Sequence, residues 1–379
     1  MFKLLKSGEC FTPEYTGKKD LLVFNGKICR IDDTILYKDL WDVEIIDCEG
    51  RLLCPGFIDQ HVHITGGGGE QGPESRIPPL MLGDILSAGV STVVGVLGAD
   101  GLTRGIADLL AKARALEAEG ITAYIYTGSY GVPPTTLTGR VISDIAFIDK
   151  IIGVGEIAIS DSRASHCPLS SLRELAYEAN VGGMLGGKAG VMHIHVGDGR
   201  EGLKPLFELV DKSDFPIEMF VPTHLNRNKG LFEQAKGYGS LGGNLDLTAG
   251  ESSQTGYSVP DALESLLECG INAGRITVSS DGNGSIPGGG TGKVGQLLKD
   301  ITGCVLDKKI NFETVLKTVT SNVARILKLY PQKGVLSVGS DADILVLDKN
   351  DLTIYHMLAK GETCILGGKI IKRGKYEPQ

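Results

Sequence analysis

The chain has 379 residues, of which 42% are hydrophobic and 22% charged, as in ordinary globular proteins with a sizeable core. Its formal net charge of −8 argues against a nucleic-acid partner. Eight cysteines without a C-x-x-C pair indicate reduced thiols, and no run approaches the roughly 18 apolar residues of a membrane helix. The first residues lack a secretion signal, so we expect a cytoplasmic protein without a membrane partner.

Both ends of the chain carry short β-type runs that are separated by glycine turns. In the first of these segments, Asn25 and Gly26 form a strong two-residue hairpin signal. Strand-like runs such as DILVLD return after residue 331, without a helical segment among them. We therefore predict that residues 1–55 and 331–379 form one small β-sandwich domain.

The middle of the chain, residues 56–330, alternates apolar β-type runs with helix-period segments. The runs are GFIDQHVHI, VSTVVGVLG, ITAYIYTGS, GEIAIS, VMHIHVG, EMFVPTH, NLDLT and RITVSSDG. Helical segments such as residues 103–120, which end at a C-cap glycine, separate them. This alternation predicts an α/β fold, a (β/α)8 TIM-like barrel, with an open doubly wound sheet as the alternative. Residues 312–330 are predicted to form a closing helix.

Histidines close several of these runs: His61 and His63 in the first, His193 and His195 in the fifth, and His224 in the sixth. In a barrel of this kind, polar residues at the carboxyl ends of strands lie in the active-site mouth. On a strand, residues i and i+2 face the same way, so each H-x-H pair presents two imidazoles to one side. The pattern predicts a catalytic metal site.

Asp281 ends the eighth run at the matching place, and no thiolate accompanies these residues. Imidazole and carboxylate ligands favour zinc over manganese, iron or nickel. Either histidine of the second H-x-H pair could bind the metal. His195 is favoured because it lies nearer the end of its strand, whereas His193 would lie one layer deeper.

The histidine and aspartate positions resemble those of the amidohydrolase superfamily. The motifs GFIDQHVHITGGGGEQGP, TGSYGVP, AISDSR, HVGDG, PTHLNRN and SSDGNGS occur in that order over most of the chain. They are similar to those of the isoaspartyl dipeptidases (β-aspartyl peptidases). The barrel and the terminal β-domain also agree with that family.

The resemblance implies a role for each matching residue. It implies that metal is bound by His61, His63, His195, His224 and Asp281. Asp281 is also implied as the general base for the metal-bound water, and Tyr130 as the group that polarises the scissile carbonyl. The implied substrate-binding residues are Glu70 for the free α-amino group, Arg163 and Arg227 for carboxylates, and Ser285 in support.

The chain departs from the family at one metal-binding position. The family commonly has a carbamylated lysine on the fourth strand that bridges two metal ions. Here that strand reads GVGEIAIS, and no lysine occurs from residue 151 to 160. Glu156 supplies the same charge and two oxygens, so we expect two Zn2+ ions bridged by Glu156. A second departure is Ala99, where we expect a hydroxyl-bearing residue.

The resemblance implies a metallo-dipeptidase that hydrolyses the isopeptide bond of β-aspartyl dipeptides with a metal-activated water. It also implies a homo-oligomer, with an octamer suggested by the resemblance alone. One alternative is another amidohydrolase: a cyclic-amide hydrolase (dihydroorotase- or hydantoinase-like) or an N-acyl-amino-acid deacylase. Such substrates would not need the Glu70 and Arg227 pair. A non-catalytic assembly protein on the same barrel is a further alternative, against which the retained histidines argue.

Overall fold

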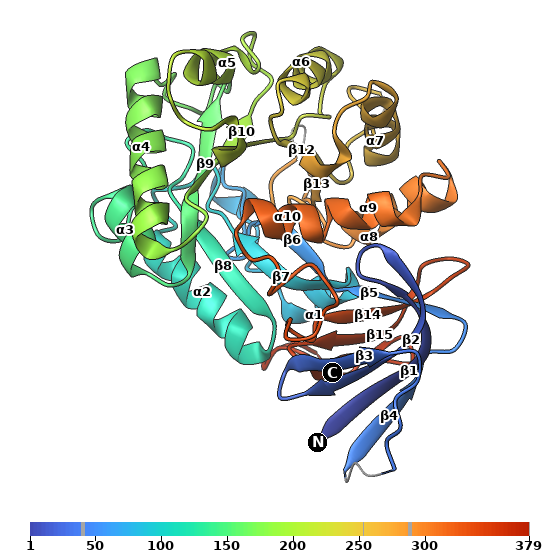
Figure 1. Ribbon diagram of the computed structural model, residues 1–379. Coiled ribbons are helices and arrows are strands. Elements are labelled where there is room, and N and C mark those ends of the chain that lie inside the picture. Colours follow the sequence, from blue (N-terminus) through green and yellow to red (C-terminus); the bar gives the residue numbers. More distant parts are fainter. Residues whose placement is uncertain (39–41, 253, 287–289, 379) are drawn as a thin grey trace.

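A computed structural model describes residues 1–38, 42–252, 254–286 and 290–378 (Figure 1). The terminal segments predicted to form the β-domain therefore include a few residues outside these ranges, namely 39–41 and 379. All predicted site residues lie within the described ranges.

Strands from the two ends of the chain pair in one mixed sheet, drawn in blue and red in Figure 1. Within the described ranges it contains β1 (Phe2–Phe11), β2 (Tyr15–Phe24), β3 (Lys27–Asp32), β4 (Val43–Asp47), β5 (Arg51–Pro55), β14 (Ile344–Asp348), β15 (Ile354–Ala359), β16 (Glu362–Leu366) and β17 (Lys369–Ile370). The antiparallel pair β5–β14 joins the two ends, with Cys54 opposite Leu345. The predicted hairpin is also present, because Asn25 and Gly26 link β2 to β3 with φ angles of 49° and 75°.

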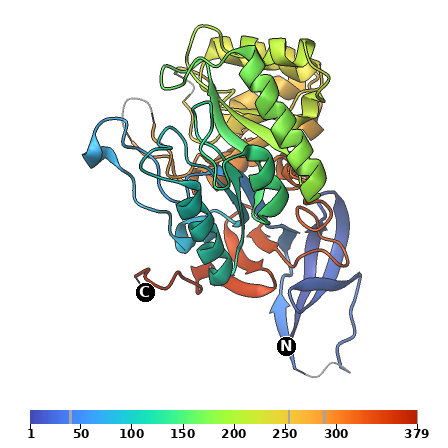
Figure 2. The same cartoon turned by 90° about the vertical axis from the view of Figure 1, so that its left-hand side faces the viewer.

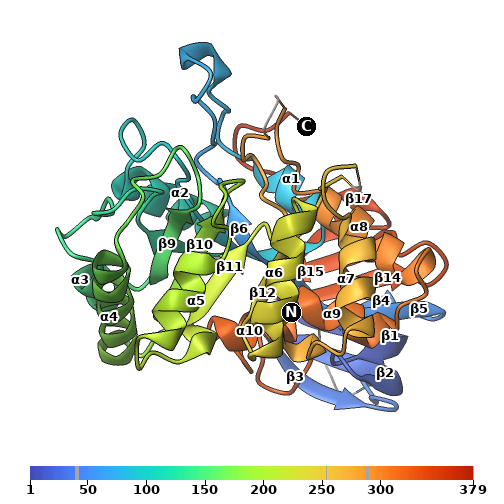
Figure 3. The same cartoon turned by 90° about the horizontal axis from the view of Figure 1, so that it is seen from above.

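The middle of the chain contributes parallel strands, one at each of the eight predicted runs. They are β6 (Phe57–Val62), β7 (Val90–Gly95), β8 (Thr122–Thr127), β9 (Ile151–Ile159), β10 (Val191–Val196), β11 (Phe220–Thr223), β12 (Leu245–Thr248) and β13 (Ile276–Ser279). Strand β9 begins before its run, GEIAIS. Strands β6 to β11 form a curled parallel sheet in chain order, and β12 pairs with β13 (Figures 1 and 3). A backbone hydrogen bond lies at each of the two places where these sheets meet. His63 N–H donates to Gly282 O (2.9 Å), and Leu225 N–H donates to Asp246 O (3.3 Å).

Helices connect these strands and cover the outer face of the curled sheet (Figure 1). The α-helices are α1 (Leu82–Ser87), α2 (Ile106–Glu119), α3 (Val141–Phe147), α4 (Leu169–Gly186), α5 (Lys204–Asp211), α6 (Lys229–Ser240), α7 (Val259–Glu268), α8 (Gln296–Leu306), α9 (Phe312–Thr318) and α10 (Ser321–Ile326). Three short 3-10 turns, η1 (Pro73–Ser75), η2 (Ile217–Met219) and η3 (Ala273–Arg275), also occur in the described part of the chain. A large apolar core fills the space between strands and helices.

The predicted closing helix is interrupted between α9 and α10. The carbonyl of Val319 accepts a hydrogen bond from Ile58 N–H of β6 (2.8 Å), so it is taken out of the helical ladder. The Thr320 hydroxyl donates to the Leu316 carbonyl at 2.6 Å, a side-chain bond that caps the first helix. This tertiary contact, which no local pattern signals, explains why one predicted helix is two.

Helix α10 closes the amino-terminal end of the parallel strands. Val323 and Leu327 pack with Ile58, Val94 and Val221, all of which are buried. The opposite, carboxyl-terminal end is lined by polar side chains instead. The polar residues gather at the end of the sheet where the sequence pattern places an active site.

Two expectations from composition can be compared with the structure. Among the described residues, no helix is long and apolar enough to cross a membrane. All eight cysteines are free thiols, as their spacing predicts.

Candidate active site

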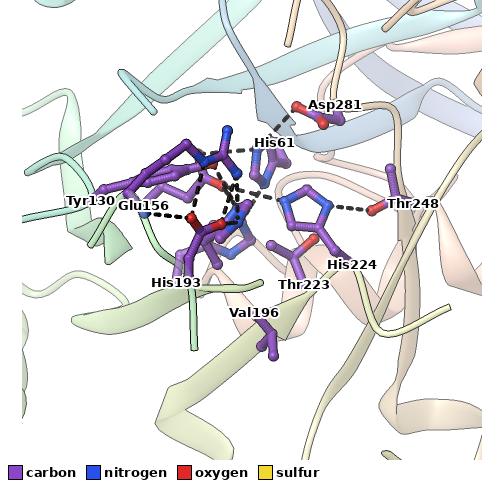
Figure 4. A network of polar contacts seen from close by, with 12 residues as sticks. His61, Tyr130, Glu156, His193, Val196, Thr223, His224, Thr248 and Asp281 are labelled. Atoms are coloured by element: carbon purple, nitrogen blue, oxygen red, sulfur yellow. Dashed lines mark hydrogen bonds and ion pairs between the residues drawn. The ribbon is translucent and has the colours of Figure 1, made fainter. Parts of the chain in front are cut away.

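Histidine and carboxylate side chains from separate strands converge at the carboxyl-terminal end of the parallel sheet (Figure 4). His61 belongs to β6, Glu156 to β9 and His195 to β10, while His224 directly follows β11 and Asp281 follows β13. Their side chains are almost completely buried, with Asp281 the most exposed at 16%.

The first group of atoms surrounds the end of β6. His61 Nε2 lies 3.4 Å from Asp281 Oδ1 and 3.5 Å from Glu156 Oε2. His63 Nε2 lies 3.1 Å from the same aspartate oxygen and 3.9 Å from the same glutamate oxygen. Both imidazoles of the H-V-H pair thus face one point, as the strand period predicts.

The second group surrounds the other oxygen of Glu156. His195 Nδ1 lies 2.7 Å from Glu156 Oε1, and His224 Nε2 lies 3.3 Å from it. In each group, one ligand atom per residue lies within 4.8 Å of the others, among His61, His63 and Glu156 and among Glu156, His195 and His224. Glu156 therefore belongs to both groups and presents one oxygen to each.

The donor atoms fit a divalent metal ion. Within the described residues, His61 Nε2, Glu156 Oε2 and Asp281 Oδ1 are buried and have no hydrogen-bond partner. Leaving such a group unpaired costs about 1–3 kcal/mol, more when it is charged. Three of them aimed at one point are explained by a bound cation, and nitrogen and carboxylate donors suit a divalent one.

The backbone at two of these residues is strained. His224 and Asp281 have φ angles of 63° and 50°, a left-handed conformation that costs a non-glycine residue about 1–2 kcal/mol. His224 directly follows β11, and Asp281 lies two residues beyond the end of β13. Strain of this kind concentrates at functional sites.

The second ring nitrogens of His224 and His61 have partners behind the site. His224 Nδ1 lies 2.8 Å from the Thr248 hydroxyl of β12, and His61 Nδ1 lies 2.8 Å from His193 Nε2 (Figure 4). Contacts of this kind fix which nitrogen of a metal-binding histidine is free for the metal. His193 thus lies behind His61, one layer deeper than His195.

Burial and charge shift the protonation of the central groups. Although burial opposes ionisation, the field of His61 and hydrogen bonds from His195 and His224 hold the pKa of Glu156 well below its ordinary value. Burial likewise opposes ionisation of Asp281, but the adjacent imidazoles of His61 and His63 hold its pKa well below normal. Burial and the nearby Glu156 raise the pKa of Tyr130 well above its usual range, so its hydroxyl keeps its proton.

Charged side chains face this centre from the surrounding loops. Glu70 Oε1 accepts a hydrogen bond from Ser285 Oγ (2.9 Å) and lies 3.6 Å from Arg163 Nη1. Arg227 Nη1 donates to the Val196 carbonyl at 3.2 Å, and the Tyr130 hydroxyl lies 2.9 Å from His195 Nδ1. These residues line a narrow inner cavity of about 10 Å³ over the buried histidines. A cavity of about 580 Å³ opens beyond Glu70, Arg163 and Ser285.

The glycine-rich loop after β6 brings Glu70 to the site. The loop extends away from the body of the molecule as far as η1 (Figures 2 and 3). A Cβ on Gly66 would lie 2.0 Å from Ile77 O, and one on Gly68 would lie 2.3 Å from Ser75 O, so side chains have no room. The buried Arg104 guanidinium, from the segment just before α2, donates to the Gly67 carbonyl at 2.8 Å and holds the loop in place.

Comparison with known proteins places the chain in a family. A family model described as the amidohydrolase family matches residues 272–371. A solved β-aspartyl dipeptidase from the thermophilic, keratin-degrading Fervidobacterium islandicum AW-1 has 43% sequence identity and a TM-score of 0.92, with 98% of each chain covered. The chain belongs to the β-aspartyl dipeptidase family.

A second structure of this family comes from the same organism and contains a β-Asp-Leu dipeptide. It has 42% identity and a TM-score of 0.91, again over 98% of each chain. Among curated relatives, the dihydroorotase of Aquifex aeolicus (strain VF5) is 46% identical over 71 residues. That match spans 18% of this chain and only 16% of the dihydroorotase. The isoaspartyl dipeptidase resemblance in the sequence motifs is thus confirmed.

In this family member, the structure brings all the residues singled out in the sequence to one end of the parallel sheet. Sequence reasoning missed Asp161 and Thr248, which contact His195 and His224, and Arg104, which holds the loop that carries Glu70. Asp161 lies two positions before Arg163 in the SDSR motif, and Thr248 ends a predicted strand, so position alone could have drawn attention to both. No local signal marks Arg104, because it lies at the start of an ordinary helix pattern.

Proposed function

We propose that this protein hydrolyses the isopeptide bond of β-aspartyl dipeptides. The proposal rests on one observation above all: a buried cluster suited to a divalent metal lies beneath an acid and two arginines. Opposite charges at this spacing suit a small zwitterion with a free amino group and two carboxylates. The family membership of the chain supports the same activity.

We propose that the metal centre holds two Zn2+ ions bridged by Glu156, which stands in place of a carbamylated lysine. His61, His63 and Asp281 would hold one ion, and His195 and His224 the other. When bound, zinc supplies a strong positive charge and makes a bound water acidic enough to act near neutral pH. Two oxygens of one carboxylate facing two histidine pairs support this arrangement.

The protein's own groups then carry the proton and orient the bond. Asp281 is anionic and can take a proton from the attacking water. The same carboxylate can then return this proton to the leaving amine. Tyr130 keeps its hydroxyl proton and donates a hydrogen bond to the oxygen of the scissile carbonyl. One such donor typically contributes about 3 kcal/mol of transition-state stabilisation.

The charged residues above the centre bind the ends of the substrate. Glu70 would accept the free α-amino group, Arg163 and Arg227 the carboxylates, and Ser285 would support the interaction. In the unliganded arrangement Glu70 faces Arg163 at 3.6 Å. A zwitterionic dipeptide replaces both halves of that pair, whereas a molecule with one charge leaves the other half unpaired.

We also propose that the parallel strands form a closed eight-stranded barrel. Backbone hydrogen bonds at both junctions between the two parallel sheets support closure. On this view residues 56–330 are the barrel and residues 1–55 with 331–379 the small β-sandwich domain. The homo-oligomer, the octamer and the cytoplasmic location stay predictions.

The alternatives differ in what they require of Glu70. A cyclic amide or an N-acylated amino acid has no free α-amino group, so it would leave Glu70 without a counter-charge. A non-catalytic assembly protein would not need the unpaired donor atoms of the buried cluster. The position of Glu70 beside Arg163, in a cavity that Arg227 also lines, therefore favours dipeptide hydrolysis.

Metal analysis combined with a substrate panel tests the proposal. The panel contains β-Asp-Leu, α-Asp-Leu, N-acetyl-β-Asp-Leu, dihydroorotate and a hydantoin. We expect turnover of β-Asp-Leu at least about 100-fold above that of every other compound, because each of the others loses or misplaces at least one charged group. Faster turnover of a cyclic amide, or none of any compound by metal-loaded protein, contradicts the proposal.

A further inference from the structure

Asp161 lies directly beside the proposed metal centre, although it does not contribute to either group of metal-facing atoms. It follows β9, the strand that carries Glu156, and it is 7% exposed. Its two oxygens contact two different functional side chains, His195 and Arg163. A buried carboxylate with two such partners links the metal centre to the substrate-binding side.

The first contact concerns the protonation of His195. Asp161 Oδ2 lies 2.9 Å from His195 Nε2, while His195 Nδ1 lies 2.7 Å from Glu156 Oε1. With a divalent metal held by His195 Nδ1 and Glu156, the proton of His195 would stay on Nε2 and form the hydrogen bond to Asp161. Asp161 thereby selects the tautomer whose Nδ1 lone pair faces the metal.

The second contact concerns the orientation of Arg163. Its Nε donates to Asp161 Oδ1 at 3.0 Å and its Nη2 to Oδ2 at 2.7 Å, a two-pronged ion pair. The Arg163 backbone N–H also donates to Asp161 Oδ1, at 2.8 Å. With that edge of the guanidinium occupied, Nη1 remains on the side of Glu70 and the outer cavity. Such pairs fix geometry as well as adding energy.

We propose that Asp161 is a positioning residue that fixes the orientations of the metal ligand His195 and the substrate-binding Arg163 relative to each other. Its single carboxylate determines which nitrogen of His195 faces the metal and which edge of Arg163 faces the substrate. The Arg163 half of this inference rests on the proposed dipeptidase function, whereas the His195 half rests on the metal centre alone. Metal affinity and substrate affinity both depend on this one side chain.

Zinc titration of the metal-free protein against a chromogenic chelator tests the metal half without any turnover. Asp161→Asn keeps the shape of the side chain but loses its charge, and its amide nitrogen replaces one of the two acceptor oxygens with a donor. We expect the affinity of one of the two zinc sites to fall about 10–100-fold, with the other nearly unchanged. Asp198→Asn is the matched control, because Asp198 borders the same outer cavity but bonds Asn228. Its zinc affinities should equal those of the unaltered protein.

Steady-state kinetics at saturating zinc test the substrate half. Asp161→Asn should raise KM for β-Asp-Leu about tenfold or more, with a smaller change in kcat. In an Arg163→Met background, the same substitution should leave KM unchanged, because Asp161 acts on the substrate through Arg163. A merely structural role would lower thermal stability and kcat without this dependence on Arg163.

The outcomes separate the two proposals. Failure of the unaltered enzyme to cleave β-Asp-Leu overturns the dipeptidase function, while the zinc titration still decides the role of Asp161 at His195. Unaltered zinc affinity and KM in Asp161→Asn overturn the inference. If that variant does not fold, Asp161→Glu displaces the carboxylate by one methylene. A lower zinc affinity and a higher KM in Asp161→Glu then support the inference, and unaltered zinc affinity and KM overturn it.

Discussion

Glu156 occupies the position on which both groups of histidines depend. Oε1 faces His195 and His224, while Oε2 faces His61 and His63. Glu156 Oε2 has no hydrogen-bond partner among the described residues. A neutral amide in this position would therefore gain no hydrogen bond there. The residue therefore offers a sharp test of the metal centre.

Replacement of this glutamate by its amide should disable the centre. In Glu156→Gln, one metal-facing oxygen becomes an amide nitrogen with no free electron pair for a metal. We expect bound zinc to fall by at least one ion per chain and kcat/KM to fall at least about 100-fold. Elemental analysis and β-Asp-Leu hydrolysis measure both. Glu178→Gln is the control, since Glu178 is a largely buried glutamate that pairs with Arg140 on the outer helices. Full zinc content in Glu156→Gln would show that Glu156 is not a ligand.

Removal of the charge at Glu70 should affect the substrate and not the metal. We expect Glu70→Gln to lower kcat/KM for β-Asp-Leu by about 10–100-fold, the usual effect of losing a charge-assisted hydrogen bond. Zinc content should not change, because Glu70 contacts Ser285 and Arg163 and no proposed metal ligand. Acetylation of the substrate's amino group should also lower kcat/KM by a smaller factor in this variant than in the unaltered enzyme. An equal factor in both proteins contradicts the amino-group role.

At the scale of elements, the glycine-rich loop between β6 and α1 determines whether Glu70 reaches the site. Gly66 and Gly68 approach backbone atoms of the returning chain too closely for a Cβ, and Gly68 also has a φ of 71°. A left-handed conformation is strained for any other residue. The loop is thus held by close backbone contacts and by Arg104.

A single methyl group in this loop should therefore impair substrate binding. In Gly68→Ala, the new Cβ would lie 2.3 Å from Ser75 O, so the loop must shift. We expect a stability loss of about 1–3 kcal/mol and a KM for β-Asp-Leu raised about tenfold. Thermal unfolding and steady-state kinetics measure the two effects. Gly105→Ala serves as control because a Cβ there has nothing within 4 Å, and both values should stay near those of the parent. A Gly68→Ala variant with normal KM contradicts the role of the loop.

At the scale of the whole molecule, a buried lysine connects the terminal sheet to the parallel strands. Lys333, 4% exposed, donates to Asp343 Oδ2 and to the Thr122 hydroxyl of β8, both at 2.6 Å, and lies 2.8 Å from Asp341 Oδ2. Thr122 begins β8, at the end of the strands opposite the metal centre. The connection therefore affects stability separately from catalysis.

Loss of this lysine should destabilise the fold and spare the active site. Lys333→Met leaves the buried Asp343 without its cationic partner, and breaking a buried pair typically costs about 3–5 kcal/mol. We expect a clearly lower thermal midpoint with unchanged zinc content and kcat at 25 °C. The exposed Lys349, replaced by Met, is the control and should leave the midpoint unchanged. An equal midpoint in both variants contradicts the structural role.

The same network predicts a pH dependence of stability. Burial opposes ionisation of Asp341, but Lys333 and a hydrogen bond from Lys27 hold its pKa below the ordinary 3.8. A lowered pKa in the folded state stabilises the protein above the ordinary value, and this stabilisation is lost as pH falls below it. Asp341→Asn should therefore be less stable by about 1–3 kcal/mol at pH 7, and the difference should shrink below pH 4. Denaturant titrations at pH 7, 5 and 3 measure it; a constant difference contradicts the ion pair.

Many elements could be predicted because their signals are local. The strand ends with His61, His63 and His224 follow from apolar runs and from the two-residue period of a strand, and the hairpin at Asn25 follows from turn chemistry. The break at Val319 could not be predicted, because Ile58 causes it from more than two hundred residues away. Asp161 was missed for a related reason: side chains in a loop after a strand follow no period.

The amino-acid sequence by itself determined the alternation of strands and helices and the residues with which the strands end. Its motifs also indicated the family. Only the tertiary structure decided that Glu156 faces both histidine groups, that His193 lies behind His61, and that Asp161 contacts both His195 and Arg163. The physical reason is that spacing along the chain controls which way a side chain leaves its own strand. Distances between side chains of different strands depend on how the sheet curls and how its helices pack.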